Sequence, residues 1–460
     1  MKKNLFVIGI GFLLIGASII SACTKEGPMG KPGADGTNGT NGTNGTNGTN
    51  GVDGGTNCQE CHNPATVTLV AEQFEFSKHK YGEAAFGESG TVGCVPCHSS
   101  EGFKYVCQNN ISAAFTQNAT TLRWTNGYNT IPTASIGEIT CNTCHSSLHT
   151  TYGKEDFSPL TTIAPVPMTF YGNGDATNAA KTINLTQDGG ISNLCVKCHQ
   201  PRPFTNSLTN GNVLNYDSLK NFPAITFYAA TNPDQVNKLR PGYRTHTHYG
   251  TVGAIFAGKG GVEFAGTETY GNSPHTTLAT CQDCHMATQT GRAGGHTFNA
   301  SGNFAGCNKS GCHTDMSATK TSFVGDQAAA KQALADLAAK LTIGGVNIMN
   351  MNPDATTNLW AGKTAKNYDG YLNIYDPINN PNGISNNPAG TFKNPSTSGM
   401  SAAQIAINSG LPAITLTNAQ MGAIINFQLC LREYSLGVHN TKYTMALLKN
   451  TIAAIPAATK

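Results

Sequence analysis

Five copies of one short cysteine–histidine pattern constrain this chain more than any other feature of its sequence. The pattern is Cys-x-x-Cys-His, and its copies begin at Cys58, Cys94, Cys141, Cys195 and Cys281. With 15 cysteines and 13 histidines among 460 residues, about 0.01–0.02 copies of this pattern would arise by chance. The fold must therefore accommodate whatever these five groups bind.

The pattern is the attachment signature of c-type haem. Two thiols form thioether links to the vinyl groups of one haem, and the adjacent His lies under the iron as its proximal axial ligand. Zinc knuckles and redox Cys-x-x-Cys pairs are the alternatives, but neither requires a His after every second Cys. The predicted attachment cysteines are Cys58, Cys61, Cys94, Cys97, Cys141, Cys144, Cys195, Cys198, Cys281 and Cys284, and the predicted proximal ligands are His62, His98, His145, His199 and His285.

A sixth, longer variant of the pattern is CNKSGCH, residues 307–313. It ends in Cys-His like the other five but has four residues between its cysteines. Gly311 would let the larger loop fold back so that Cys307 and Cys312 both reach one haem, with His313 as the proximal ligand. A disulfide between Cys307 and Cys312 is the alternative. The expected cofactors are thus six c-type haems, five on CxxCH and one on CxxxxCH.

Seven histidines lie outside these motifs, and six irons need six distal ligands for full bis-His coordination. His246 and His248 alternate in RTHTHYG and compete for one role, for which His248 is preferred. His149 follows His145 by four residues and would serve a neighbouring iron rather than its own. The expected distal ligands are His79, His149, His248, His275, His296 and His439.

Several short stretches resemble multihaem c-type cytochromes, in the broad grouping that includes cytochrome c nitrite reductase and hydroxylamine oxidoreductase. These stretches are FSKHKYG before CVPCHSSEGF, HTHYG before GKGGVEF, SPHTTLATCQDCHM, GGHTFNA and SLGVHNTKY. The resemblance covers about half of residues 58–460 and implies distal roles for His275, His296 and His439. Nitrite reductases of that grouping bind their catalytic haem through CxxCK, whereas all six motifs here end in His. The resemblance therefore does not extend to nitrite reduction.

The N-terminus indicates export. Lys2 and Lys3 precede an apolar stretch from Leu5 to Ile20, which predicts a signal peptide over residues 1–22. The following Ile-Ser-Ala-Cys resembles a bacterial lipobox, which implies cleavage before Cys23 and lipidation of its thiol; an uncleaved membrane span is the alternative. The Lys25-Glu26 pair resembles a surface-export signal. We expect an exported outer-membrane lipoprotein, with cell-surface exposure suggested by that pair.

Residues 27–54 carry glycine at every third position, the period of collagen. Only Pro28 and Pro32 fall in this segment, so a triple helix would be weakly stabilised. Residues 23–57 are therefore predicted to be a lipidated tether, with a trimeric stalk as the alternative. Extended, the repeat would reach on the order of 80–90 Å.

Residues 58–460 are predicted to form one hexahaem domain, mainly α-helical with long irregular loops, and organised around its haems. A helix is expected from a cap at Asp326 to a stop at Gly344. Two C-terminal helices are expected as well. The first starts at a capping box at Thr417 and ends near Glu433, and the second runs from about Asn440 to Pro456. Cys107 and Cys430 are left over, as a disulfide or as two free thiols.

Charged residues make up only 12% of the chain and nearly balance, at +3. A nucleic-acid partner is therefore excluded, because it would require a basic stripe. The composition and motifs favour an electron-transfer protein whose partners are redox proteins or an extracellular acceptor. A reductase of nitrogen or sulfur oxyanions with one open iron is the second possibility, and a haem store or adhesive stalk is the third.

Overall fold

The structure is a computed structural model. The chain divides into two units, Met1–Gly54 and Gly55–Lys460. The structure describes residues 63–82, 89, 94–111, 115–117, 124–126, 137–146, 160–168, 182–201, 216–227, 247–343, 346–349, 392, 401–412 and 414–456, all in the second unit. The predicted signal peptide, Cys23, the Gly-X-Y segment, the first motif (Cys58, Cys61 and His62), His149 and His246 lie outside the described residues.

The described part of the chain is mainly α-helical, as predicted. Its strands form three antiparallel two-stranded ribbons, which pair β1 (Phe115–Gln117) with β2 (Trp124–Asn126), β3 (Val166–Pro167) with β4 (Thr182–Ile183), and β5 (Thr342–Ile343) with β6 (Val346–Asn347). Ribbons this short supply no continuous sheet, so the helices and loops carry the fold.

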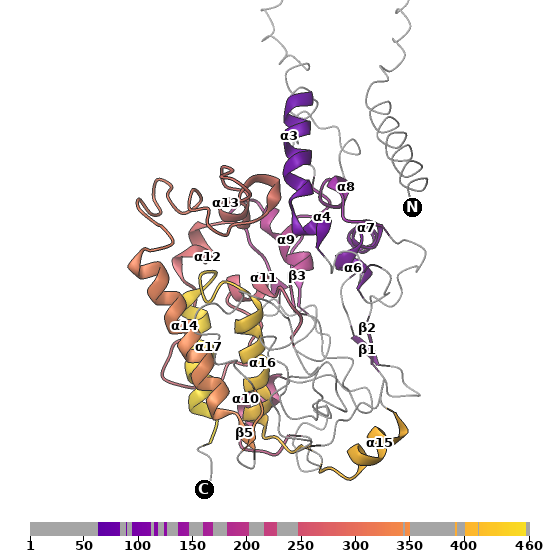
Figure 1. Cartoon of the computed structure of the whole chain (residues 1–460), viewed down its shortest axis with the longest axis vertical. Helices are drawn as coiled ribbons and strands as arrows, with labels where there is room; N and C mark the ends of the chain where they lie inside the picture. Colours follow the sequence, from indigo (N-terminus) through magenta and orange to yellow (C-terminus); the bar gives the residue numbers. More distant parts are fainter. Residues whose placement is uncertain are drawn as a thin grey trace, which may run out of the picture. The chain divides into compact units, whose positions relative to one another are not determined.

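Three C-terminal helices lie side by side, and we call them the C-terminal helical layer (Figure 1): α14 (Thr321–Lys340), α16 (Asn418–Arg432) and α17 (Thr441–Ala454). The predicted capping box at the start of α16 is confirmed, since Thr417 Oγ1 accepts from the Gln420 amide and the Gln420 side chain accepts from the Thr417 amide. Asn440 caps α17, and its side chain accepts from the Tyr443 amide. Both predicted C-terminal helices are therefore confirmed.

The bounds predicted for the helix before them were wrong. The helix was expected to start at Asp326, but α14 begins at Thr321 after Lys320 and ends at Lys340, before Leu341. A tertiary contact explains the earlier start, because the rings of Phe323 and Phe304 pack edge to face at 5.4 Å between centroids. Packing of this kind outweighs a local capping signal.

The hydrophobic core joins this helical layer to residues 247–264, together with short helices α10 (Tyr216–Asn221) and α11 (Val252–Phe256). Asn426 ties the two parts together inside the core. Its side chain accepts from the Val262 amide at 2.7 Å and donates to the Val262 carbonyl at 2.7 Å and to Thr451 Oγ1 at 2.8 Å. A buried amide bonded this fully fixes the position of residues 261–264 on α16.

The remaining helices are short and carry most of the predicted site residues (Figure 1). They are α3 (Pro64–Glu75), α4 (Lys78–Tyr81), α6 (Val95–His98), α7 (Ser100–Gln108), α8 (Cys141–Cys144), α9 (Ile191–Cys198), α12 (Pro274–Leu278), α13 (Cys281–His285), the 3-10 helix Gly295–Thr297, and α15 (Ala402–Ser409). Residues 286–320 otherwise fold as turns and extended segments.

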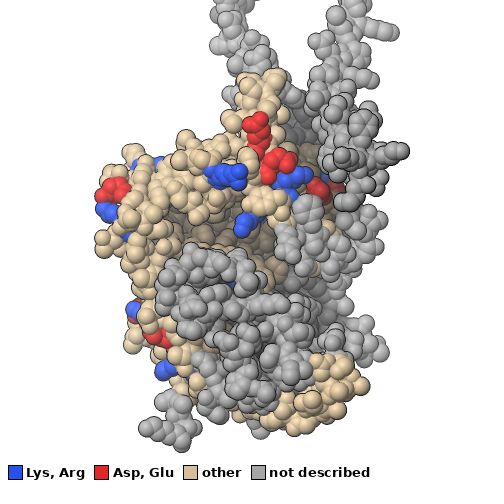
Figure 2. Space-filling view, viewed as in Figure 1, with Lys and Arg blue, Asp and Glu red and all other residues tan. Residues whose placement is uncertain are grey.

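Cys107 and Cys430 are both free thiols; Cys107 is half-buried in α7, and Cys430 is buried in α16. The disulfide alternative is therefore not formed. No helix among the described residues has the length and apolarity to cross a membrane. On the face drawn in Figure 2, the charged side chains of the described residues are few and of both signs.

Candidate functional site

Four of the motifs fold in the same way, each at a short helix. The amides of His98, His145 and His199 each donate to the carbonyl of the first cysteine of the motif at 3.0 Å, and α13 spans the fourth motif, Cys281–His285. Residues three apart on a helix lie on one face, so both thiols of a motif point to the same side. We name the sites after their motif histidines: the His98, His145, His199 and His285 sites.

The longer motif closes in the same way despite its two extra residues. The His313 amide donates to the Cys307 carbonyl at 3.1 Å, as the histidines of the shorter motifs do to their first cysteines. Gly311 makes this closure possible with a φ of +85°, a left-handed conformation that glycine adopts readily. Cys307 and Cys312 are both free, so the disulfide alternative is not formed. This is the His313 site.

Each of four motif histidines faces one of the expected distal histidines. The distances between ring centroids are 5.9 Å for His79 and His199, 6.2 Å for His98 and His248, 6.0 Å for His275 and His313, and 6.2 Å for His285 and His439. Burial lowers the pKa of His296, and the nearby fifth motif histidine, His145, lowers it further. Four motif histidines are thus matched one to one with four candidates, and His145 lies near the fifth, His296.

These distances are compatible with two imidazoles that share one metal ion. A metal–imidazole nitrogen bond is about 2.0–2.1 Å, so two imidazoles on opposite sides of one ion have nitrogens about 4 Å apart and ring centres about 6 Å apart. Five of the expected distal ligands, His248 among them, therefore lie next to a motif histidine.

Hydrogen bonds at Nδ1 fix the tautomer of four of these histidines. His248, His275 and His285 donate from Nδ1 to the carbonyls of Tyr249 at 2.8 Å, Val438 at 2.9 Å and Phe298 at 2.9 Å, respectively. His199 donates to Gly250 at 3.3 Å. A carbonyl can only accept, so the Nδ1 proton of each ring is defined, and Nε2 of His199, His275 and His285 carries the lone pair that a metal would need.

Burial keeps these imidazoles neutral, as ligation requires. Burial lowers the pKa of His79 and His285, and burial followed by the neighbouring His79 lowers the pKa of His199 to about 4. Burial also lowers the pKa of His145. Near neutral pH these rings are therefore available as ligands without a proton having to be removed.

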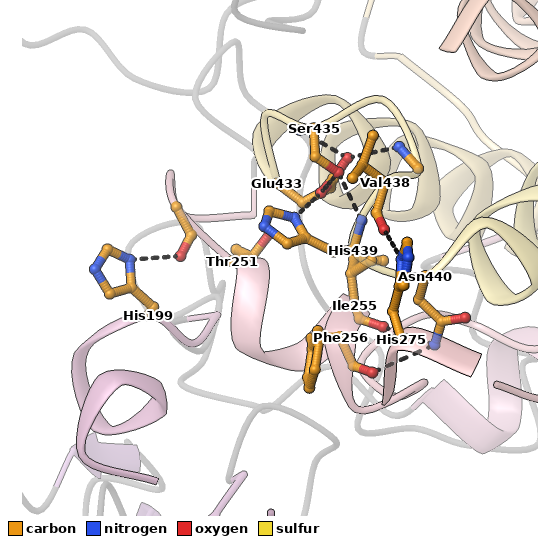
Figure 3. Close-up of polar contacts among 12 residues, drawn as sticks. His199, Thr251, Ile255, Phe256, His275, Glu433, Ser435, Val438, His439 and Asn440 are labelled. Atoms are coloured by element: carbon orange, nitrogen blue, oxygen red, sulfur yellow. Dashed lines mark hydrogen bonds and ion pairs between the residues drawn. The ribbon is translucent and has the colours of Figure 1, made fainter. Parts of the chain in front are cut away.

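His439 differs from the others in its Nδ1 partner (Figure 3). Its Nδ1 donates at 2.6 Å to a carboxylate oxygen of Glu433, whose side chain is fully buried. Burial opposes the protonated ring, but the hydrogen bond to Glu433 outweighs it and raises the pKa of His439. A carboxylate on the outer nitrogen also makes Nε2 a more basic ligand.

The motifs are neighbours in space as well. Cys97 interacts with the Cys198 thiol and raises its pKa. Cys195 interacts in the same way with Cys281, whose pKa falls to about 7 through that hydrogen bond. Burial and then Cys307 raise the pKa of Cys284 to about 11. The His199 site therefore adjoins the His98 and His285 sites, and the His285 site adjoins the His313 site.

The groups that orient the paired histidines could not be predicted from the sequence. Most are backbone carbonyls, which no motif marks. Glu433 could have been found from the sequence. It is an acidic residue at the C-cap of a helix, where the helix dipole disfavours negative charge, so its presence there indicates a specific role. Phe298, at a φ of +53°, was also missed. Its carbonyl orients His285, and its ring packs against those of His79 and His296.

Within the described residues, no group of three or more His, Cys, Asp or Glu side chains could hold a metal ion. The arrangement consists of pairs, and two protein ligands suffice only where another group supplies the remaining donors. A porphyrin supplies four, so the paired histidines and neighbouring thiols fit haem. The chain matches no family model, no curated protein and no solved structure.

Proposed function

We propose that this protein is a hexahaem c-type cytochrome that carries electrons between redox partners outside the cytoplasm. The observation that carries the proposal is the set of four histidine pairs, each joining one motif histidine to one outside histidine at 5.9–6.2 Å. Haem iron with two axial histidines has no open position, which suits electron transfer rather than substrate chemistry.

The chain's residues would hold each haem in three ways. The cysteines of the six motifs would form the thioether links, the motif histidines would supply one nitrogen ligand to each iron, and His79, His248, His275, His296 and His439 would supply a second one. When bound, each haem iron takes up and releases one electron. The carbonyls at Nδ1 keep the rings in the orientation and tautomer that ligation needs.

Contact between motifs supports transfer rather than storage. Thioether cysteines lie at the haem edge, so cysteines of two motifs in contact bring two such edges together. The contacts of Cys198 with Cys97, and of Cys195 with Cys281, make the His199 site a junction. The ion pair between Lys309 and Asp283, the residue before Cys284, extends the series to the His313 site. A store of haem would not require this order.

The sixth iron, at the first motif, decides between the two functional classes. Its motif histidine, His62, and the two unassigned histidines, His149 and His246, lie outside the described residues. With His248 placed at the His98 site, both remain candidates for its distal ligand. If neither ligates, this iron would be open, and the protein would be a reductase of small oxyanions.

The experiment is haem counting by peptide mass spectrometry, followed by EPR of the oxidised protein and CO addition to the reduced protein. We expect six haem adducts, only low-spin signals and no CO complex. Replacing His149 or His246 by Ala should produce one high-spin, CO-binding haem in one variant and none in the other. A high-spin haem in the unmodified protein would refute the electron-transfer assignment, and fewer than six adducts would refute the hexahaem assignment.

The lipobox at Cys23 supports a membrane-anchored location for the proposed cytochrome. A Cys23→Ala variant should appear in the soluble fraction of lysed cells with its haem content unchanged, whereas the unmodified protein should sediment with membranes. Equal distribution of the two proteins would rule out the anchor. Surface exposure is tested separately by protease treatment of intact cells.

A further inference from the structure

Glu433 is an ionisable side chain in an unfavourable place. It is fully buried, and it lies at the C-cap of α16, the end of a helix that repels negative charge. Burying a carboxylate is costly unless hydrogen bonds replace its water. A chain that keeps it there must gain something from the charge.

Four donors surround this carboxylate and keep it ionised (Figure 3). They are the Ser435 amide at 3.0 Å, Ser435 Oγ at 2.6 Å, the Gly437 amide at 3.1 Å and His439 Nδ1 at 2.6 Å. The fixed negative charge therefore lies one imidazole ring away from the position of the proposed iron.

The loop around this carboxylate holds a strained shape. Tyr434 and Leu436 have φ angles of +65° and +56°, and Gly437 has +92°. Left-handed backbone is rare for non-glycine residues and persists where surrounding contacts enforce it, often at functional sites. Here the strain turns the amides of Ser435 and Gly437 toward Glu433.

The same loop provides an internal comparison. Val438 accepts from Nδ1 of His275 through a neutral carbonyl at 2.9 Å, and Glu433 accepts from Nδ1 of His439 through a carboxylate at 2.6 Å. His275 faces the His313 site, and His439 faces the His285 site. Two neighbouring sites thus receive outer partners of different charge from one segment of chain.

We infer that Glu433 gives the His285 site a lower reduction potential than the neighbouring His313 site; this rests on the proposed haem binding. The anion stabilises the ferric iron over the ferrous iron, which carries one positive charge less, and the strong hydrogen bond makes His439 a better donor to the ferric state. Reduction adds one electron, supplied by a mediator dye in a titration, and breaks no bond. The proton stays between His439 and Glu433.

The test is a potentiometric titration of the full-length haem-loaded protein, followed by EPR. The ring planes of His285 and His439 lie 13° apart, whereas those of the other three described pairs lie 57–79° apart. Near-parallel axial rings give a rhombic low-spin signal, and strongly tilted rings give one with a larger maximal g value. The signal that disappears in His439→Ala identifies the His285 site.

In Glu433→Gln the amide oxygen can still accept from His439, but the charge is gone. We expect at least a tenfold rise in the reduced-to-oxidised ratio of that haem at fixed potential, about 59 mV for a one-electron couple. The other signals should not move. The control is Glu268→Gln, which removes the same charge from an exposed pair with Lys449 and should leave every potential unchanged.

Ser435→Ala is the second variant, and it should act in the opposite direction. It removes one donor from the carboxylate and the acceptor of the His439 amide, leaves the charge less compensated, and should lower the potential of the His285 site. An unchanged potential in Glu433→Gln overturns the inference. If Glu433→Gln instead releases His439 and gives a high-spin signal, Ser435→Ala decides: a downward shift supports the inference, and no shift or an upward one overturns it. Absence of haem on residues 281–285 would refute the proposed function itself, and the inference with it.

Discussion

Two regions of this chain are stabilised in different ways. In the C-terminal helical layer, every residue of α16 except Gln420 is buried. In the motif-bearing segments, residues 63–146 and 281–313, α3 buries only Gln73 and exposes Val67 and Leu69. Among the described residues of these segments, few hydrophobic side chains are buried: Cys94, Val95, Phe103, Val106, Ala287 and Ala293. The helical layer thus has a core of its own side chains, whereas the motif-bearing segments bring histidines and thiols together with little apolar support.

Because their own side chains bury so little apolar area, the motif-bearing segments need another source of apolar surface. Ordering a chain costs conformational entropy at every residue, and burial of apolar area is the main compensation. Covalent haems would supply that area and would also cross-link the segments through their paired histidines. The proposed cofactor is therefore part of the fold as well as of the function.

The largest expected effect follows from removing the haems. In chain produced without haem attachment, the amides of α3, α6, α7 and α8 should exchange with solvent at rates close to those of an unfolded chain, because their support is missing. The amides of α16 and α17 should remain protected, because their core is intact. Hydrogen exchange measured by mass spectrometry compares both regions in one sample. Equal protection of the α3, α6, α7 and α8 amides in the haem-free and haem-loaded proteins would show that haem does not stabilise the motif-bearing segments.

The next effect lies in the helical layer. Asn426→Leu removes all three hydrogen bonds of the Asn426 side chain and leaves both polar groups of Val262 buried without that partner. We expect a loss of about 2–5 kcal/mol in the free energy of unfolding. Urea unfolding followed by circular dichroism measures it.

The haem absorption bands of the folded Asn426→Leu variant should not change, since none of the described ligands contacts Asn426. Lys449→Ala, on the surface of α17, is the matched control and should cost less than about 1 kcal/mol. A shift in the haem bands before unfolding would show that the two regions are coupled more tightly than the comparison allows.

A smaller effect is expected at the longer motif. Gly311 has a φ of +85° and no atom within 4 Å of an added Cβ, so Gly311→Ala introduces backbone strain alone, about 1–2 kcal/mol. Because this turn brings Cys312 and His313 back to Cys307, we expect fewer haem adducts on residues 307–313 and unchanged adducts at the other motifs. Peptide mass spectrometry gives both values.

Gly302→Ala is the control for that variant. Gly302 has a φ of +77° and equally open surroundings, but it lies outside the motifs. The strain is similar, so a loss of haem in Gly302→Ala as large as in Gly311→Ala would mean that general destabilisation, rather than motif closure, is responsible.

Local signals in the sequence predicted local structure well. The capping box at Thr417, the cap at Asn440 and the turn at Gly311 depend on side chains and backbone within a few residues. The start of α14 was wrong because the contact between Phe323 and Phe304 is tertiary. The mainly helical class followed from these local signals, whereas the assembly of the helices around the site did not.

The candidate site also has a part that the sequence predicts and a part that depends on tertiary contacts. The motif histidines are visible in the sequence, and the number of outside histidines indicated bis-His pairing. Which histidine faces which depends on contacts far apart in the chain, such as His439 with His285. The partners at Nδ1 are mostly carbonyls, which every residue has, so only the three-dimensional structure distinguishes Val438 or Phe298 from its neighbours.

The smallest expected effect concerns the link between the last two motifs. Lys309, in the longer motif, lies 2.5 Å from Asp283 in Cys-Gln-Asp-Cys-His, and both side chains are partly exposed. Lys309→Met should cost about 0.2–1 kcal/mol, less at high salt. Burial opposes the Asp283 charge, but hydrogen bonds from Lys309 and Thr280 outweigh it and lower its pKa below 3.8. The contribution is therefore present above the unfolded-state pKa and is lost as the pH falls through the lower folded-state value.

A double-mutant cycle with Asp283→Asn isolates this pair, because Asp283 also caps α13 through Thr280 and its single variant weakens that interaction as well. The cycle should be run at low and high salt on the haem-loaded protein. If the coupling energy exceeds about 1 kcal/mol and does not depend on salt, the pair behaves as a buried one. In that case side-chain contacts would contribute to the stability of the motif-bearing segments alongside the haems, and the contrast with the helical layer would be one of degree.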